Sequence, residues 1–292
     1  MQWGTPEDLE EFLYWEDTFK KIQQKKTNKQ TLGFNIMPMA GFGKRFSEQG
    51  FKKIKPLILV NKSPMFVSAI NDLPSSFKNV FVIREDKNNK ELLQNIEKYF
   101  PESIIFKLKK PTQGQAVTSA FALKELKHKI ENLDKPITFG SCDNGIIYNF
   151  NKFKEILINK NTDVIVWGVE NYFYAKKHPS MYGWIDERNG DILRVSVKKT
   201  INNDVNKPVI IGAFTFKNYE IFFKSYDMML KEKSLVNGEY YLDELVNYSI
   251  RNGYNCKYFK VDKYLSWGTP NEYKTFNYWQ ECFSKWKFHD FS

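Results

Sequence analysis

From residue 32 onward, short apolar runs alternate with longer segments whose apolar residues recur at helical spacing. The apolar runs have the length of buried strands and lie at 34–39, 80–83, 104–106, 137–139, 163–169 and 209–216. The helical patterns lie at 64–73, 88–100, 115–130, 220–231 and 241–252. Two further runs, 182–186 and 192–197, flank Asn189-Gly190, a dipeptide that favours a hairpin turn. This alternation predicts one α/β domain over residues 32–292, with a mixed but mainly parallel central sheet flanked by helices.

A helical pattern at residues 3–21 returns near the other end of the chain. Each copy opens with Trp-Gly-Thr-Pro, and the aromatic residues that follow keep the same phase: Phe12, Trp15 and Phe19 in the first copy and Phe276, Trp279 and Phe283 in the second. Such a repeat predicts that residues 1–31 are a tail helix and linker, the remnant of a preceding, similar domain in a longer polypeptide. The aromatic stripe, which includes Trp3, needs a partner surface on its own domain or on a second molecule in a homodimer. The alternative is a native N-terminal cap.

Composition narrows the class of protein. Of the 292 residues, 42% are hydrophobic and 27% charged, as in an ordinary soluble enzyme, and no run approaches the roughly 18 apolar residues of a membrane span. The net charge is +10, but the lysines are scattered and no basic helix carries interleaved aromatic residues, which favours an anionic substrate over nucleic acid. Three cysteines without paired spacing indicate a reduced, cytoplasmic protein.

The strand at 34–39 runs into a small-residue turn, Ala40-Gly41-Phe42-Gly43, and a group of cations follows it: Lys44, Arg45, Lys52, Lys53 and Lys55. Backbone N–H groups in such a turn can surround phosphate oxygens, and the cations can balance their charge. A plain tight turn would also explain the two glycines taken alone.

The combination G-x-G-x-R-F followed by K-x-K-P resembles the signature of nucleotidyltransferases that make nucleoside-diphosphate sugars and related choline and polyol derivatives. The resemblance covers about residues 32–287 and implies a single Rossmann-like domain of the GT-A-like type. It implies that Arg45 and Lys55 are catalytic. The nucleotide-binding residues that it implies are Met39, Ala40, Gly41, Gly43, Lys44, Gln113 and Gly114, the last two at the edge of the base.

Two acids are candidates for holding Mg²⁺. Asp143 directly follows a predicted strand, at the edge where open α/β sheets bind ligands, and its carboxylate suits Mg²⁺. The family that the chain resembles has a second carboxylate before the glycine of its late motif, where this chain has Ser266-Trp267-Gly268-Thr269. Asp262 is the nearby substitute, although a simple strand-end aspartate is an equal alternative.

The acceptor site is also implied by the resemblance. Gly183 and Glu239 match segments that line the acceptor pocket in the family. The lysine that grips the acceptor phosphate corresponds to Lys198 or Lys199, with the choice between them open. The family's Glu-Lys-Pro pattern is altered here, because Val197 replaces the glutamate and Thr200 the proline.

The implied reaction is attack of an acceptor phosphate oxygen on the α-phosphorus of a nucleoside triphosphate, with release of pyrophosphate. The Pro-Met-Ala-Gly form of the loop resembles the branch that often uses CTP, so we favour a cytidylyltransferase for a phosphorylated sugar, polyol or choline-like acceptor in bacterial capsule or cell-surface polysaccharide synthesis. The alternatives are a UTP- or dTTP-dependent sugar-1-phosphate pyrophosphorylase, a GT-A glycosyltransferase, and a non-catalytic nucleotide-binding module. The missing late carboxylate favours the last of these, and the absence of Asp-x-Asp at Asp143 speaks against the glycosyltransferase.

Overall fold

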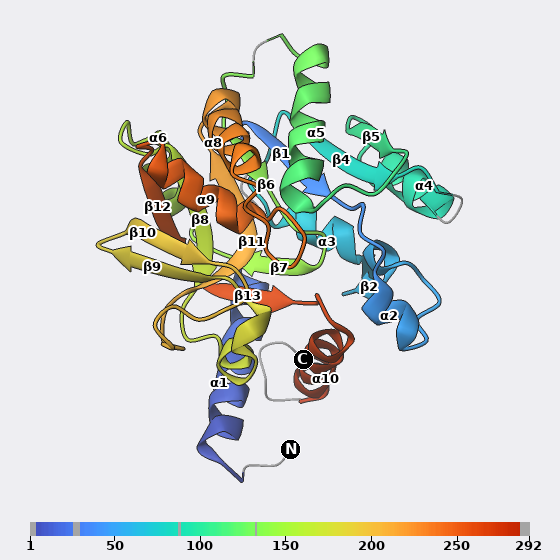
Figure 1. The fold of residues 1–292 in the computed structure, drawn as a ribbon. Coiled ribbons are helices and arrows are strands. Elements are labelled where there is room, and N and C mark those ends of the chain that lie inside the picture. The colour runs from blue at the N-terminus through green and yellow to red at the C-terminus, as the bar shows by residue number, and fades with distance from the viewer. Residues whose placement is uncertain (1–3, 26–29, 87–88, 132, 287–292) are drawn as a thin grey trace.

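The computed structural model describes residues 4–25, 30–86, 89–131 and 133–286 (Figure 1). Nine strands of these residues form one sheet in the order β5-β4-β1-β6-β11-β8-β12-β10-β9. Their bounds are β1 Phe34–Pro38, β4 Lys78–Arg84, β5 Ile104–Leu108, β6 Ile137–Phe139, β8 Val164–Val169, β9 Trp184–Arg188, β10 Asp191–Ser196, β11 Val209–Phe216 and β12 Cys256–Lys260.

The sheet is parallel only in its first part. Strands β5, β4, β1 and β6 pair in parallel, as expected for strands separated by helical crossovers. β11 then pairs antiparallel with both β6 and β8, and the hairpin β9–β10 is antiparallel, while β8 and β12 are parallel. The α/β class is therefore confirmed, and the sheet beyond β6 is mixed to a greater degree than the alternation of elements indicated.

Two apolar layers cover the two faces of the sheet. One layer contains α5 Gln115–Lys129, α8 Tyr219–Lys231 and α9 Leu242–Arg251. The other contains α3 Met65–Asn71, α4 Lys90–Tyr99 and α6 Phe150–Ile158. Alternate residues of β8 enter opposite layers, with Val164 and Val166 on the first side and Ile165 and Trp167 on the second. Both faces are thus buried, which explains why the strands read as continuous apolar runs.

A separate two-stranded sheet lies beside the main one. β7 Asn144–Ile147 pairs antiparallel with β13 Lys263–Ser266, which aligns Asn144 with Ser266. Both strands are buried along their whole length. Short elements complete the described chain: α2 Lys44–Glu48, η1 Lys55–Leu57, β2 Leu59–Val60, β3 Ser63–Pro64, α7 Phe173–Lys177 and η3 Pro179–Met181.

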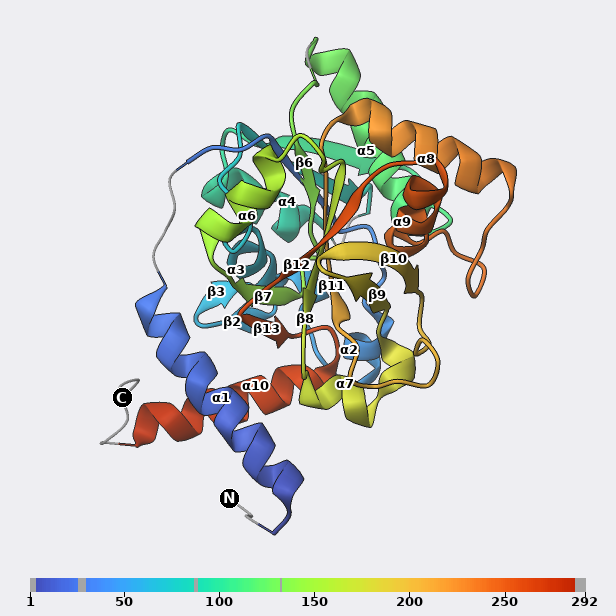
Figure 2. The same ribbon diagram turned by 90° about the vertical axis from the view of Figure 1, so that its left-hand side faces the viewer.

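The two copies of the repeated motif form helices α1 Pro6–Gln24 and α10 Pro270–Lys285, which cross one another (Figure 2). Their aromatic faces interlock, with ring centroids 5.7 Å apart for Phe12 and Phe283 and 5.8 Å apart for Phe19 and Phe276. Phe12, Trp15 and Phe19 are all buried. The described part of the aromatic stripe is therefore covered within the same molecule. Trp3 and residues 26–29 of the linker lie outside the described residues.

The N-terminal segment also braces the small sheet. The Tyr14 hydroxyl donates to the carbonyl of Tyr264 in β13 at 2.5 Å and accepts from the Tyr264 N–H at 3.3 Å. Beyond α1, Lys25 pairs with Asp72 and donates to the carbonyl of Ile146 in β7 at 3.1 Å. The other oxygen of Asp72 accepts from the Ile146 N–H at 2.8 Å. Both strands of the small sheet are thus tied to residues near the start of the chain.

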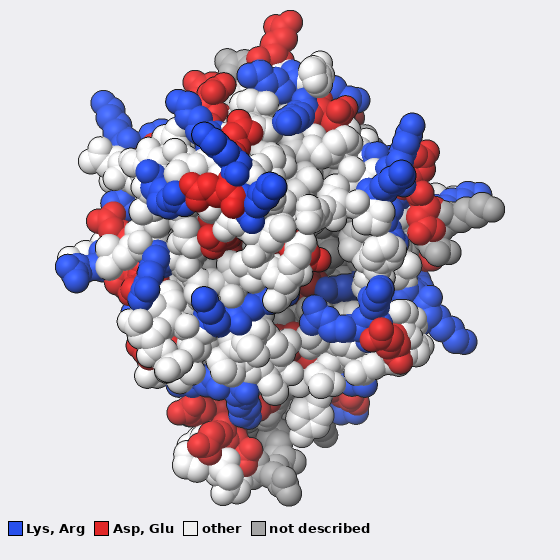
Figure 3. All heavy atoms as spheres, viewed as in Figure 1, with Lys and Arg blue, Asp and Glu red and all other residues white. Residues whose placement is uncertain are grey.

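Charged side chains of both signs are interspersed on the face shown in Figure 3, without one continuous basic patch. In the described ranges, no helix is long and apolar enough to cross a membrane.

Candidate active site

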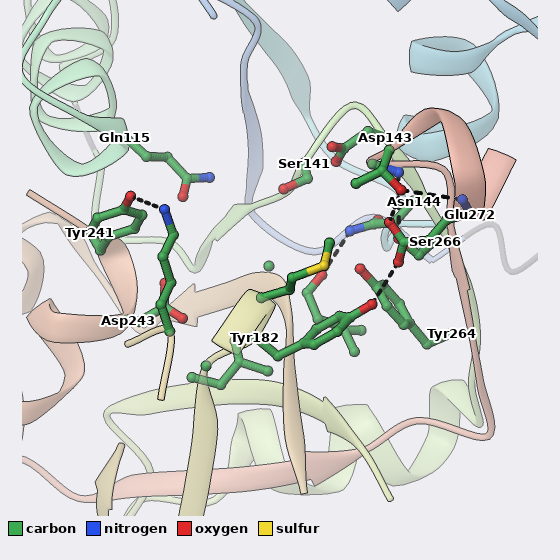
Figure 4. Close-up of a pocket in the computed structure, with 18 of the residues that line it drawn as sticks. Gln115, Ser141, Asp143, Asn144, Tyr182, Tyr241, Asp243, Tyr264, Ser266 and Glu272 are labelled. Carbon is green, nitrogen blue, oxygen red and sulfur yellow. Dashed lines mark hydrogen bonds between the residues drawn. The ribbon is translucent and has the colours of Figure 1, made fainter. Parts of the chain in front are cut away.

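A pocket opens between the small sheet, β11, and the first turns of α9 and α10. Figure 4 shows Asp143, Ser266 and Glu272 on one side of it and Gln115, Tyr241 and Asp243 on the other. Of the residues expected from the sequence to form the site, the pocket lining includes Arg45, Asp143, Gly183 and Lys198.

Asp143 and Lys55 form the closest charged pair in this region. The Lys55 Nζ donates to Oδ2 of Asp143 at 2.5 Å and to the carbonyl of Gly268 at 3.2 Å. Burial opposes the charged form of Lys55, but the nearby Asp143 carboxylate outweighs it, so the pKa of Lys55 is raised and the ammonium is kept. Burial, with the Asp143 charge next, raises the pKa of the Cys142 thiol to about 12, so Cys142 is not a nucleophile.

The glycine loop packs against Lys55. Gly43 has φ +63°, and a Cβ at this position would lie 3.2 Å from Cβ of Lys55, so the turn requires glycine. Met39 is buried in the core, whereas Gly41 and Lys44 are exposed. Within this loop and the start of α2, Arg45 is the residue that lines the pocket.

Gln113 and Gly114 lie at the start of α5, where they meet a distant segment. Gly114 has φ +110°, and a Cβ there would lie 2.5 Å from the carbonyl oxygen of Tyr240. The Tyr240 N–H donates to the Gln113 carbonyl at 2.9 Å, while the Gln113 side chain is exposed. The amide side chain that lines the pocket belongs to Gln115 instead.

The two candidate acceptor lysines differ in position. Lys198 lines the pocket with φ +52°, and its Nζ donates to the Tyr241 hydroxyl at 2.6 Å. Lys199 is exposed, and its carbonyl accepts from Ser196 Oγ. Glu239 is exposed and is not among the residues that line the pocket. The pKa of the Tyr241 hydroxyl is raised mainly by burial and, to a smaller extent, by a hydrogen bond with Glu239.

Residue 183 must be glycine, because the Asp243 side chain and the Ser196 backbone pack closely against it. A Cβ at residue 183 would lie 2.4 Å from Oδ1 of Asp243 and 2.9 Å from the carbonyl oxygen of Ser196. Any larger residue here would displace the Asp243 carboxylate. The expected acceptor-site glycine therefore sits at the pocket wall directly beside a carboxylate.

Asp262, the expected second metal ligand, does not join Asp143. It is exposed in the turn between β12 and β13, where its N–H donates to the Ile147 carbonyl at 2.8 Å. Ser266, which lines the pocket, is at the opposite end of β13. A fully extended strand of four residues spans about 13 Å, so Asp262 is separated from Ser266 by roughly the length of β13.

Glu272, in the first turn of α10, supplies the second carboxylate of the pocket. It is buried; its Oε1 accepts from the Tyr182 hydroxyl at 2.6 Å and its Oε2 from the Thr269 hydroxyl at 2.9 Å. Burial, with the Glu272 charge next, raises the pKa of Tyr182, so its hydroxyl keeps its proton and remains a donor.

The space beside Gly268 is surrounded by oxygen atoms. A Cβ on Gly268 would lie 3.2 Å from Asp143 Oδ2, 3.6 Å from Ser266 Oγ and 3.7 Å from Glu272 Oε2. Carboxylate and hydroxyl oxygens are the donors that Mg²⁺ prefers, so this set fits that ion. In the described chain no group of three or more His, Cys, Asp or Glu residues gathers for a metal. The protein would therefore supply few ligands, as is usual where Mg²⁺ also binds substrate phosphates.

Several lining residues were not expected from the sequence: Gln115, Ser141, Met181, Tyr182, Tyr241, Tyr264 and Glu272. Most follow no glycine motif or charge cluster, and they reach the pocket only through the packing of distant elements. Glu272 had a local signal, since Thr269 and Glu272 have the spacing of a helix capping box, but that signal predicts only a helix start.

No family model matches this chain, and no curated protein sequence matches it. Solved structures do. The nucleoside-diphosphate-sugar pyrophosphorylase from Vibrio cholerae aligns with a TM-score of 0.68 and 19% identity, covering 83% of this chain and 98% of its own. A UDP-glucose pyrophosphorylase in complex with UDP-glucose aligns with a TM-score of 0.64 and 17% identity, covering 86% of this chain and 100% of its own. The inositol-1-phosphate CTP transferase from T. maritima aligns with a TM-score of 0.62 and 14% identity, covering 87% of this chain and 98% of its own. At these identities the shared property is the fold, and the resemblance drawn from the sequence is confirmed at that level.

Proposed function

We propose that the protein is a nucleotidyltransferase that moves a nucleoside monophosphate from a nucleoside triphosphate to a phosphorylated acceptor and releases pyrophosphate. The observation that carries this proposal is the ion pair between Lys55 and Asp143, because Asp143 lines a pocket that Arg45 and Lys198 also line. These groups suit a reaction between phosphates, because the three cations can offset phosphate charge while the Asp143 carboxylate can hold a divalent cation.

The described residues divide the work of such a transfer. In this proposal Lys198, which lines the same pocket as Gly183, holds the acceptor phosphate, and Arg45 and Lys55 offset charge on the triphosphate. An acceptor phosphate is already ionised at neutral pH, so the reaction needs positioning and charge stabilisation rather than a general base. When bound, Mg²⁺ would be held by Asp143 with Ser266 or Glu272 beside it and would supply further charge stabilisation.

We further propose that CTP is the preferred triphosphate and that the acceptor is a phosphorylated sugar, polyol or choline-like alcohol used in a cell-surface polysaccharide. The structural neighbours include a CTP transferase and a UDP-glucose pyrophosphorylase, so they are compatible with CTP and with UTP. The preference for CTP rests on the Pro38-Met39-Ala40-Gly41 form of the loop.

The chain has Gly145 where an Asp-x-Asp motif that starts at Asp143 would need its second carboxylate, which speaks against a glycosyltransferase. The Asn144 side chain is buried, and its Nδ2 donates to the Ile211 carbonyl at 2.7 Å. It therefore fixes β7 against β11 and does not extend the Asp143 site with a second metal ligand.

The direct experiment incubates the purified chain and Mg²⁺ with each of the four common nucleoside triphosphates and a panel of sugar 1-phosphates, polyol phosphates and phosphocholine. Pyrophosphate release that depends on both substrates is expected, with CTP the most active. Arg45→Ala is the matched variant, because the guanidinium lines the pocket and has no described core contact. Glycosyl transfer from a nucleotide sugar without pyrophosphate release, or nucleotide binding without turnover, would overturn the proposal.

A further inference from the structure

Asp243 is a carboxylate in the pocket to which the proposed reaction assigns no task. It lies in the first turn of α9, on the opposite side of the pocket from Asp143 (Figure 4). Its Oδ1 is adjacent to Gly183, where even a Cβ would come within 2.4 Å. Within the described residues, the Asp243 carboxylate accepts a hydrogen bond from its own backbone N–H.

The surroundings of Asp243 are unfavourable for a carboxylate that accepts few hydrogen bonds. Val197 and Ile210 are buried apolar residues that line the same pocket, and the nearest cation is Lys198. The Lys198 ammonium donates to Tyr241 rather than to Asp243. Asp243 is half-buried, and a carboxylate partly withdrawn from water without enough donors is unfavourable; the N-terminal end of α9 offsets only part of that cost.

We propose that Asp243 accepts a hydrogen bond from a hydroxyl or ammonium group of the acceptor, carried next to the phosphate that Lys198 holds. This rests on the proposed function, because it assigns Lys198 to the acceptor phosphate. Lys198 and Asp243 then set the orientation of the acceptor, because its phosphate binds Lys198 and its hydroxyl or ammonium group donates to Asp243. Phosphates that bear a donor near the phosphate fit this subsite, and those with a second anion there do not.

The pH dependence of acceptor binding follows from the groups that face Asp243. Burial raises the pKa of Asp243 to about 6; the Lys198 charge acts in the opposite direction, and Glu244, on the same helix, adds to the increase. Tyr241, also at the start of α9, and Tyr182, before β9, line the same pocket, and burial raises the pKa of both. An ionised carboxylate accepts a hydrogen bond better than a protonated one, so binding of a donor-bearing acceptor should strengthen as pH rises through about 6.

The test measures binding of three phosphate probes by calorimetry: ethanolamine phosphate with an ammonium, glycerol 1-phosphate with hydroxyls, and ethyl phosphate with neither. The full chain is compared with Asp243→Asn and with Asp227→Asn, an exposed aspartate of α8 outside the pocket lining. The wild type should bind one donor-bearing probe roughly 10- to 100-fold more tightly than ethyl phosphate, the range expected for a hydrogen bond to a charged group. Asp243→Asn should remove that preference and leave ethyl phosphate binding unchanged. Which of the two donor-bearing probes is preferred distinguishes an ammonium from a hydroxyl.

Equal binding of all three probes by the wild type would overturn the subsite, as would an equal loss for every probe in Asp243→Asn. The titration of the phosphate itself is common to the wild type and the variant, so a pH dependence that vanishes only in Asp243→Asn belongs to the carboxylate. The wild-type preference needs no variant and stands even if Asp243→Asn fails to fold. Pyrophosphate release is measured separately: turnover without probe preference would refute the subsite alone, and probe preference without turnover would refute the transferase alone.

Discussion

Replacing Asp243 with asparagine should stabilise the folded protein, and the gain should grow with pH. Burial raises the pKa of this carboxyl from 3.8 to about 6. Between these two values the folded state holds a proton that the unfolded state has released. Stability attributable to Asp243 is therefore greatest at low pH and is lost as pH rises through about 6. Asparagine has nearly the same shape and no charge, so it avoids this loss.

The size of the effect follows from the two pKa values. They differ by about two pH units, each worth about 1.4 kcal/mol of unfolding free energy, so the full contribution is about 3 kcal/mol above pH 7. At pH 4 the same relation gives a contribution of only roughly 0.5 kcal/mol to the unfolding free energy. The advantage of Asp243→Asn should thus increase by about 2.5 kcal/mol between pH 4 and pH 8, whatever constant difference the two side chains have in packing.

Urea denaturation of wild type and variant at pH 4, 5, 6 and 8 measures this increase directly. Asp227→Asn is the control, because Asp227 is an exposed aspartate on α8 that lies outside the pocket lining. A wild-type-to-Asp243→Asn difference that stays flat from pH 4 to pH 8 would show that the carboxylate is well solvated or already paired.

Five other substitutions test the site and the helix that supports it. Asp143→Asn should keep the circular dichroism of the wild type and lose Mg²⁺-dependent pyrophosphate release, because an amide lacks the charge that the cation needs. Lys55→Ala and Arg45→Ala should lower kcat on the order of 100-fold with little change in Tm, and a collapse of Tm with normal activity per folded molecule would make them structural. Gly183→Ala should raise the acceptor KM and leave nucleotide affinity unchanged, since its methyl group meets a carboxylate oxygen at 2.4 Å. Tyr14→Phe should lower the free energy of unfolding by about 1–3 kcal/mol and speed amide exchange in β13, whose backbone its hydroxyl holds; unchanged exchange would refute the bracing role.

The sequence was sufficient to predict the elements that depend on local patterns. The runs at 34–39, 80–83 and 104–106 became β1, β4 and β5 in a parallel arrangement, because strands joined by helical crossovers have little alternative. The small sheet of β7 and β13 was not predicted. Its strands are four residues each and lie more than a hundred residues apart, so neither has a period that a local pattern can reveal.

The same division applies to the candidate site. Arg45 lies in α2, which follows β1 through the glycine loop, and Asp143 lies in the loop between β6 and β7; both residues line the pocket. Asp262 lies outside the pocket lining, because its proximity to Ser266 in sequence does not give proximity in space: strand β13 separates the two. Glu272 reaches the pocket although it is farther along the chain, since the turn at Gly268 reverses direction and returns the first turn of α10 towards Asp143.

The repeated motif shows why a capping box alone does not make a site residue. In the first copy Thr5 and Asp8 form a complete capping box at the start of α1, where Thr5 is exposed and Asp8 is half-buried. In the second copy the Glu272 carboxylate also accepts from the Thr269 hydroxyl, yet it is buried and accepts from Tyr182 as well. The carbonyl of Gly268 accepts from Lys55, whereas the nearest contact of a Cβ on Gly4 would be Asp8 at 3.8 Å. The two copies therefore share the signals that start a helix and bury its aromatic face, and only the second is placed where its carboxylate meets the pocket. The second copy follows directly on β13, which places it at the site, and α1 supports that strand through the Tyr14 hydroxyl.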